Sequence, residues 1–359
     1  MKKFPLVLAI NFLVASLGSL TACSSNQKID IMYGDTSVKD VTTLKFDQLK
    51  EKIDSKDNFL LAVQYSEGCG CWSQDAHPIF EKFIDEKHVN IYHIKLEELD
   101  GGGNRFGITI ITGNVSFAVF EEGVVKSCVT TKDDTTLKKY DDFTAYLDSL
   151  VALPRIYYST LDDIDRIYRT DEKNIVYFGR KTCGDCGYLE THYLKTWSKN
   201  NPGFTKKIYL LDCDQQDIRL DDEGKVNAEQ WQQFKDDYGL STKRNPTYGY
   251  DTGYVPTMLL VKGSLNGPEF LSGTVVFNDS VSKVDDKFVV SNSYFTEERL
   301  PNLAYIDDKV EHKVVKGLEL TLDDVTYNEE KGWARWNHES AEKYHNIMVE
   351  KFLAWSEKQ

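Results

Sequence analysis

Residues 174–186 read NIVYFGRKTCGDC, an apolar run followed by two cysteines that are two residues apart. The run NIVYF is typical of a buried strand, and YLETHYLKTW (188–197) is typical of a helix. Cys183 should therefore lie just before a helix, and Cys186 one turn inside it. Free backbone N–H groups and the positive end of the helix dipole both stabilise a thiolate at such a position.

The same plan of strands and helices occurs twice along the 359 residues. The first copy has predicted strands at 59–65, 89–96, 115–120 and 124–130 and a closing helix at about 137–151. The second has strands at 174–178, 206–213, 255–263 and 270–277 and helices at 161–169, 228–239 and about 339–357. Strands that alternate with helices and end in a hairpin predict a central mixed sheet flanked by helices. We expect an α/β chain with domains over 41–152 and 153–359, the second with insertions at about 214–253 and 279–337.

An apolar strand, C-x-x-C opening a helix and Val255-Pro256-Thr257 opening a later strand together resemble the thioredoxin family. The stretch VYFGRKTCGDC (176–186) is also similar to the thioredoxin-like bacteriocin transport accessory proteins of bacteria. The resemblance covers most of 40–277, once per copy, and implies two thioredoxin-like domains. It further implies that Cys183 attacks protein or peptide disulfides and Cys186 resolves the mixed disulfide. Val255, Pro256 (as a cis-proline) and Thr257 would then hold an extended substrate, without any cofactor.

The second copy departs from the family pattern at three positions. Tyr177 stands where thioredoxins keep a buried aspartate, Thr182 replaces a tryptophan, and Thr191 replaces the mid-helix proline. These departures argue against efficient thioredoxin-like reduction and leave a structural or inert cysteine pair as an alternative. A zinc site would need four ligands, for which only Cys213 and His192 could join the pair, so no metal is expected.

The first copy carries a different cysteine pattern, Cys69-Gly70-Cys71. Counting from the preceding strand and back from Pro78 places Gly70 and Ser73 in the catalytic positions. We therefore expect a degenerate, non-catalytic domain. Cys69 and Cys71 could still form a small, strained and easily reduced disulfide. Alternatively, one of them bonds to Cys128, or the pair has no chemistry.

Two further residues enter these expectations. Ser116 is expected at the position that Pro256 occupies in the second copy, which would leave the first domain without a substrate strand. Cys213 ends a predicted strand beside the one that leads to Cys183. It is either the partner of Cys183 in an alternative disulfide, and so a secondary redox residue, or a small buried residue.

Residues 1–23 resemble the signal peptide of a bacterial lipoprotein. Lys2 and Lys3 precede a short apolar segment that ends in LTAC (20–23), which is similar to a lipobox. The resemblance implies diacylation at Cys23, a polar tether over 24–40 and anchoring at the extracytoplasmic face of the cell membrane. An ordinary cleaved signal with an incidental cysteine is the alternative. Export would place the remaining cysteines where disulfides persist.

The formal charge of −14 argues against a nucleic-acid partner. The motifs described above lead to two hypotheses for the function of the chain. The first is a lipid-anchored thiol–disulfide oxidoreductase that acts on extracytoplasmic protein disulfides through Cys183 and Cys186. The second is a non-catalytic surface module, serving transport or partner binding on a thioredoxin scaffold.

Overall fold

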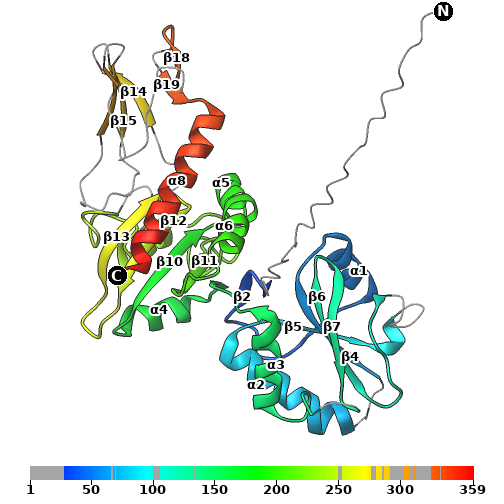
Figure 1. Ribbon diagram of the computed structural model, residues 1–359. Coiled ribbons are helices and arrows are strands. Elements are labelled where there is room, and N and C mark those ends of the chain that lie inside the picture. The colour runs from blue at the N-terminus through cyan, green and yellow to red at the C-terminus, as the bar shows by residue number, and fades with distance from the viewer. Residues whose placement is uncertain are drawn as a thin grey trace, which may run out of the picture.

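The computed structural model describes residues 28–359 except 66–67, 69, 100–105, 133–134, 250–252, 276–279, 285–286, 292–302, 308–309, 312–324 and 332. Two sheets with helices packed against them form two domains, and a third sheet precedes the last helix (Figure 1). None of the helices in these described residues combines the length and apolar character needed to cross a membrane. Cys23 and the rest of the expected signal peptide lie outside the described residues.

The first domain contains a five-stranded sheet of order β3-β5-β4-β6-β7. Strand β4 is parallel to β5 and antiparallel to β6, and all six of its residues are buried. The strands of the first domain are β3 (Thr42–Thr43), β4 (Phe59–Gln64), β5 (Ile91–Lys95), β6 (Val115–Glu121) and β7 (Val124–Thr130). Its helical segments are α1 (Phe46–Asp54), η1 (Cys71–Ala76), α2 (His77–Lys87), η2 (Leu96–Glu98) and α3 (Tyr140–Leu150).

Alternate residues of β4 face two different cores. Leu60 and Ala62 pack with α2 and α3, where Phe80 and Phe143 have ring centroids 5.4 Å apart. Leu61 packs in a second core with residues of α1 on the other face of the sheet. Figure 1 shows α2 and α3 together on one side of the sheet and α1 on the other. This two-sided burial explains why β4 reads as a continuous apolar run.

The second domain repeats this arrangement with the order β13-β12-β10-β11-β9-β2. Strand β10 is parallel to β11 and antiparallel to β12. The strands of the second domain are β2 (Tyr33–Asp35), β9 (Ile156–Tyr158), β10 (Lys173–Gly179), β11 (Ile208–Asp212), β12 (Thr257–Lys262) and β13 (Glu269–Val275). Its helical segments are α4 (Leu161–Arg169), α5 (Gly184–Tyr188), η4 (Leu189–Leu194), α6 (Lys195–Asn200), α7 (Ala228–Tyr238) and α8 (His338–Glu357).

The sheet of the second domain also separates two cores. One core joins Tyr177 of β10 to η4, α6 and α8, and the other joins Phe178 to α4 and α7. Apart from β2, both sheets share one strand order, with the central strand parallel on one side and antiparallel on the other. The prediction of two thioredoxin-like domains with mixed sheets flanked by helices is therefore confirmed.

The expected tether at 24–40 is corrected for its described part, because residues 28–36 are integrated in the fold. Strand β1 (Ile29–Asp30) pairs with β8 (Val151–Ala152), and β2 adds a sixth strand beside β9. Ile29 and Ile31 pack in the first domain, whereas Tyr33 packs against the core of the second. Ile29, Ile31 and Tyr33 thus link the two cores, but this stretch is too short for its alternating apolar pattern to predict a strand.

Gly34 permits this close approach of β2. A Cβ atom at Gly34 would lie 2.6 Å from the His88 carbonyl oxygen and 2.5 Å from the Tyr157 ring. The amide of Asp35 donates to the same His88 carbonyl at 2.9 Å. A residue with a side chain at 34 would therefore push β2 away from both domains.

The expected insertion at 279–337 contains a six-stranded antiparallel sheet of order β17-β16-β15-β14-β19-β18. Its strands are β14 (Ser280–Val284), β15 (Lys287–Ser291), β16 (Leu303–Asp307), β17 (Val310–Glu311), β18 (Val325–Asn328) and β19 (Trp333–Trp336). The chain then returns through α8 to the second domain (Figure 1). The sequence analysis assigned no structure to this insertion.

Candidate active site

Cys183 lies at the N-cap position of α5 with an extended backbone. Its carbonyl accepts the first helical hydrogen bond, from the amide of Gly187 at 3.0 Å, and its own amide donates to Arg180 at 3.1 Å. Its side chain is half-buried and its thiol is free. The strand–turn–helix arrangement therefore presents this sulfur at the mouth of the helix, as expected from the sequence.

Cys186 lies one turn further on and is 1% exposed. Its sulfur accepts the amide N–H of Arg180 at 3.4 Å, and its thiol is also free. Burial raises the pKa of the Cys186 thiol well above its usual range, and the nearby Cys183 adds to this effect. The two cysteines thus differ sharply in access to solvent, which suits a reaction that begins at the outer sulfur.

Val255, Pro256 and Thr257 lie beside the outer cysteine. The Val255–Pro256 peptide bond is cis, and the Cys183 thiol contacts the Val255 carbonyl at 3.7 Å. Thr257 is 1% exposed and donates from its hydroxyl to Tyr254 at 2.6 Å. The structure therefore brings the cysteine pair and the Val-Pro-Thr segment together, although Cys183 and Val255 are 72 residues apart in the sequence.

A buried polar cluster lies beneath Cys186. The Tyr177 hydroxyl donates to Glu190 Oε1 at 3.1 Å and also contacts the Cys186 sulfur. Tyr158 donates to Glu190 Oε2 at 3.4 Å, and Tyr33 donates to the Glu190 carbonyl at 2.8 Å. Burial raises the pKa of the Glu190 carboxyl, and the hydrogen bonds from Tyr177 and Tyr158 only partly oppose that effect.

Glu190 was missed in the sequence analysis. It lies four residues after Cys186, so the two share one helix face, and this spacing was a usable signal. A glutamate on a helix is ordinarily solvated, however. The residues that bury its carboxyl come from β2, β9 and β10, which are distant in the sequence.

The rim of the site carries paired charges. Lys181 lies 3.5 Å from Asp212, and Asp214 binds Arg219 at 2.6 Å while accepting the Thr182 hydroxyl. The positive charge of Lys181, two residues before Cys183, is therefore partly neutralised by a carboxylate from the end of β11. The Lys181 side chain is exposed, so its pair with Asp212 contributes little to stability.

Cys213 follows β11 and is completely buried in the same core cluster as Cys186. Its amide donates to the Gly179 carbonyl at 2.8 Å, which fixes it at the edge of the sheet. Burial raises the pKa of its thiol well above the usual range. These features agree with the interpretation of Cys213 as a small buried residue.

The first domain lacks the equivalent pair of thiols among its described residues. Gly70 is the N-cap of η1 and Ser73 lies within it, as the counting predicted. Cys71 is disulfide-bonded, and Cys128 is free, so the alternative of a bond to Cys128 is wrong for Cys71. Cys69 lies outside the described residues.

The expected equivalence of Ser116 and Pro256 is also wrong. Pro256 immediately precedes β12, whose first residue Thr257 pairs with Phe178. Ser116 is the second residue of β6 and pairs with Val63 inside the ladder. Its hydroxyl is buried and donates to the Thr109 carbonyl at 2.6 Å, so it supports local packing.

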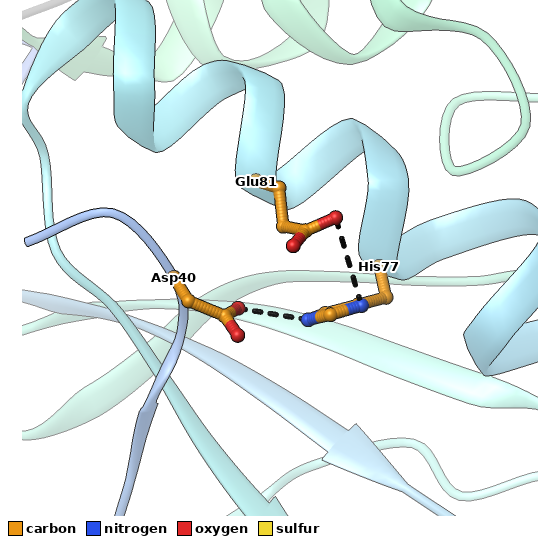
Figure 2. Close-up of side chains that lie close together, drawn as sticks. All are labelled: Asp40, His77 and Glu81. Carbon is orange, nitrogen blue, oxygen red and sulfur yellow. Dashed lines mark hydrogen bonds and ion pairs between the residues drawn. The ribbon is translucent and has the colours of Figure 1, made fainter.

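Asp40, which precedes β3, and two residues of α2, His77 and Glu81, form the group that most resembles a metal site in the described residues. Figure 2 shows the His77 ring between two carboxylates, with Nε2 at 2.8 Å from Asp40 and Nδ1 at 3.9 Å from Glu81. A single ion could not bind both ring nitrogens of one histidine. The arrangement therefore suits a histidine side chain held between two acidic side chains better than a metal centre, and no metal is assigned to it.

His93 forms a second buried polar site in the first domain. It is 5% exposed, its ring contacts Gln64 at 3.1 Å and Thr43 at 3.2 Å, and the tilted Trp72 ring lies 4.4 Å away between centroids. Burial lowers the pKa of His93 to about 4. The ring is therefore neutral at pH 7, with each nitrogen facing one hydrogen-bond partner.

We expect the first domain to lose stability as the pH falls from 6.5 to 4. In this window the unfolded chain binds a proton at His93 that the folded domain excludes, at a cost of up to about 3 kcal/mol. Hydrogen-exchange protection of β4 should fall accordingly, after correction for intrinsic rates. The variant H93Q should lose this part of the pH dependence; equal losses in H93Q and the natural chain would contradict the assignment.

Comparison with known proteins adds little to this geometry. Neither the protein-family models nor the curated proteins searched include a match to the chain. Among solved structures, human ERp44 (form I) is similar at 8% identity and TM-score 0.32, over 64% of this chain and 52% of that one. The first two thioredoxin domains of Naumovozyma dairenensis Eps1p are similar at 13% identity and TM-score 0.25, over 64% and 90%.

Full-length ERdj5 is similar at 8% identity and TM-score 0.23, over 64% of this chain and 30% of that one. This chain spans about half the length of the ERp44 structure that it matches. Because these TM-scores all lie below 0.5, the fold assignment rests on strand order and connectivity within the two sheets.

Proposed function

We propose that the chain is a thiol–disulfide oxidoreductase that acts through Cys183 and Cys186 on extracytoplasmic protein disulfides. One observation carries this proposal: a half-buried free thiol at a helix start contacts the carbonyl that precedes a cis-proline, and a buried free thiol lies one turn inside the helix. This arrangement places the reacting sulfur next to a backbone group that an extended peptide could pair with.

The reaction proceeds in two balanced steps. The Cys183 thiolate attacks one sulfur of a substrate disulfide, forms a mixed disulfide and releases the other substrate sulfur as a thiolate, which takes a proton. The Cys186 thiol then loses its proton and attacks the Cys183 sulfur. The second substrate sulfur leaves as a thiolate, so the substrate is reduced and the cysteine pair is oxidised. The reverse sequence oxidises a substrate dithiol.

Export and lipid anchoring belong to the same proposal. They are supported by the basic start, the short apolar segment and the LTAC sequence that ends at Cys23. An anchored protein outside the cytoplasm would meet protein thiols and disulfides in a compartment where disulfides persist. Its partners would then be exported proteins with extended, accessible cysteine segments.

The reduction potential of the 183–186 pair tests the function. We expect a value clearly above about −300 mV, because structural disulfides lie below that level and catalytic ones above it. The measurement is equilibration with glutathione buffers followed by alkylation and mass spectrometry of the peptide that contains both cysteines. A potential below about −300 mV would instead favour the non-catalytic surface module.

A further inference from the structure

Cys186 reacts only after its thiol has lost a proton, yet its sulfur is buried. The amide of Arg180 donates to this sulfur and cannot accept a proton. Two side chains contact the sulfur, Cys183 and the Tyr177 hydroxyl, and Tyr177 is itself fully buried. Cys183 is bonded to substrate in the resolving step, so the route for the proton begins at the Tyr177 hydroxyl.

The position of the Tyr177 ring is built into the strand. Gly179 follows two residues later on the same face of β10, and a Cβ atom there would lie 2.7 Å from the ring and 3.0 Å from the hydroxyl oxygen. Any larger residue at 179 would displace the hydroxyl. The absence of a side chain at 179 therefore makes room for the contact between Tyr177 and its polar neighbours.

Glu190 accepts the hydrogen bond that the Tyr177 hydroxyl donates. Its carboxyl is 3.1 Å from the Tyr177 hydroxyl, and its backbone carbonyl is held by Tyr33 at 2.8 Å. It lies in η4, a π-helical turn of the kind that often occurs at functional sites. The titratable groups that face it are Tyr33 of β2, Tyr158 of β9, Tyr177 of β10, Asp212 of β11 and Lys181.

We propose that Tyr177 and Glu190 form a proton relay for Cys186, replacing the strand aspartate that is missing here. In the resolving step the Cys186 thiol proton passes to the Tyr177 oxygen while the Tyr177 proton passes to Glu190 Oε1. The freed electron pair of Cys186 forms the bond to the Cys183 sulfur, and the substrate thiolate leaves. In the reverse direction Glu190 returns the proton through Tyr177 to the departing Cys186 thiolate.

Two properties support this assignment. A tyrosine hydroxyl has one proton and can accept another hydrogen bond, so it can pass a proton without itself becoming charged. Burial raises the pKa of the Glu190 carboxyl, which brings its proton affinity closer to that of a group working near neutral pH. Tyr177 thus touches a reacting atom, whereas Glu190 acts through Tyr177. The inference rests on the proposed function, because it concerns the second step of disulfide exchange.

The two steps can be followed separately with the aromatic disulfide DTNB and the full chain in its reduced form. Attack by Cys183 releases the first coloured thiolate, and attack by Cys186 on the mixed disulfide releases the second. We expect E190Q and Y177F to leave the first phase within about twofold and to slow the second at least about tenfold at pH 7. Both should also change the pH profile of the second phase, which a purely structural role would not.

Y209F is the matched control, because Tyr209 is a buried tyrosine on the neighbouring strand and belongs to the core on the opposite face of the sheet. It should keep both phases, and C183S supplies the background from the other cysteines. Thermal unfolding checks each variant, and either relay variant alone decides the question if the other does not fold. A natural second-phase rate and pH profile in a folded E190Q or Y177F would overturn the relay. An absent first phase in the natural chain would overturn the proposed function, and the relay with it.

Discussion

Replacing Cys183 with serine is expected to abolish disulfide exchange, by at least about 10³-fold, whereas replacing Cys186 is expected to trap the substrate. A serine hydroxyl at 183 is not ionised near neutral pH and cannot attack a disulfide. In C186S the outer thiol still attacks, but no second thiol displaces the substrate. Turnover of insulin or a peptide disulfide should stop in both variants, and a mixed disulfide at Cys183 should accumulate only in C186S, as seen by mass spectrometry.

Cys128→Ala is the matched control for this pair of variants. Cys128 is a free, half-buried thiol in the first domain, far in the chain from the proposed site. Its replacement should leave turnover within about twofold. Equal activity in C183S and the natural chain would show that exchange occurs elsewhere, and an absence of trapped substrate in C186S would show that Cys183 is not the attacking sulfur.

The architecture was largely predictable because the strands that carry it are continuous apolar runs. Strands β4 and β10 are buried on both faces, and such runs are visible in the sequence without any partner. The apolar run at 174–178 and the helical pattern at 188–197 likewise placed Cys183 just before the helix that begins with α5. Local sequence patterns were sufficient to predict an element wherever that segment alone determines its secondary structure.

Predictions were wrong where long-range pairing decides the structure. Strand β2 has only three residues, and its pairing with β9 depends on a close approach at Gly34 that no local pattern reveals. The register of β6 places Ser116 inside the ladder, and a shift of this kind is invisible in a uniformly apolar strand. The placement of β2 and the register of β6 thus depend on pairing between distant segments, which local sequence patterns do not indicate.

The polar cluster under Cys186 illustrates the same limit at the site. Tyr177 was noted as a departure from the family pattern, but its partner Glu190 was not recognised. The helix spacing between Cys186 and Glu190 was visible, whereas the burial of the carboxyl depends on Tyr33 and Tyr158 from two other strands. Tyr177, which in the sequence only marks the absence of the buried aspartate, is therefore part of a different polar network in the fold.

The last helix provides the second large effect, because Phe352→Ala is expected to lower the free energy of unfolding of the second domain by about 3–5 kcal/mol. The Phe352 ring is completely buried in the core that also contains Trp197 and Tyr177. Helix α8 thus covers the face of the sheet on which the active-site helix packs, even though the third sheet precedes it in the chain. Urea unfolding followed by tryptophan fluorescence measures the change.

Glu350→Ala, two residues away on the exposed side of α8, is the control and should change stability by less than about 0.5 kcal/mol. The Thr205 amide and hydroxyl both bind the Glu357 carboxylate, which fixes the end of α8 against the loop after α6 independently of Phe352. F352A should therefore loosen the middle of the helix while its end stays attached. A loss below about 1 kcal/mol would mean that α8 does not close this core, and that the second domain is held together by its sheet and remaining helices alone.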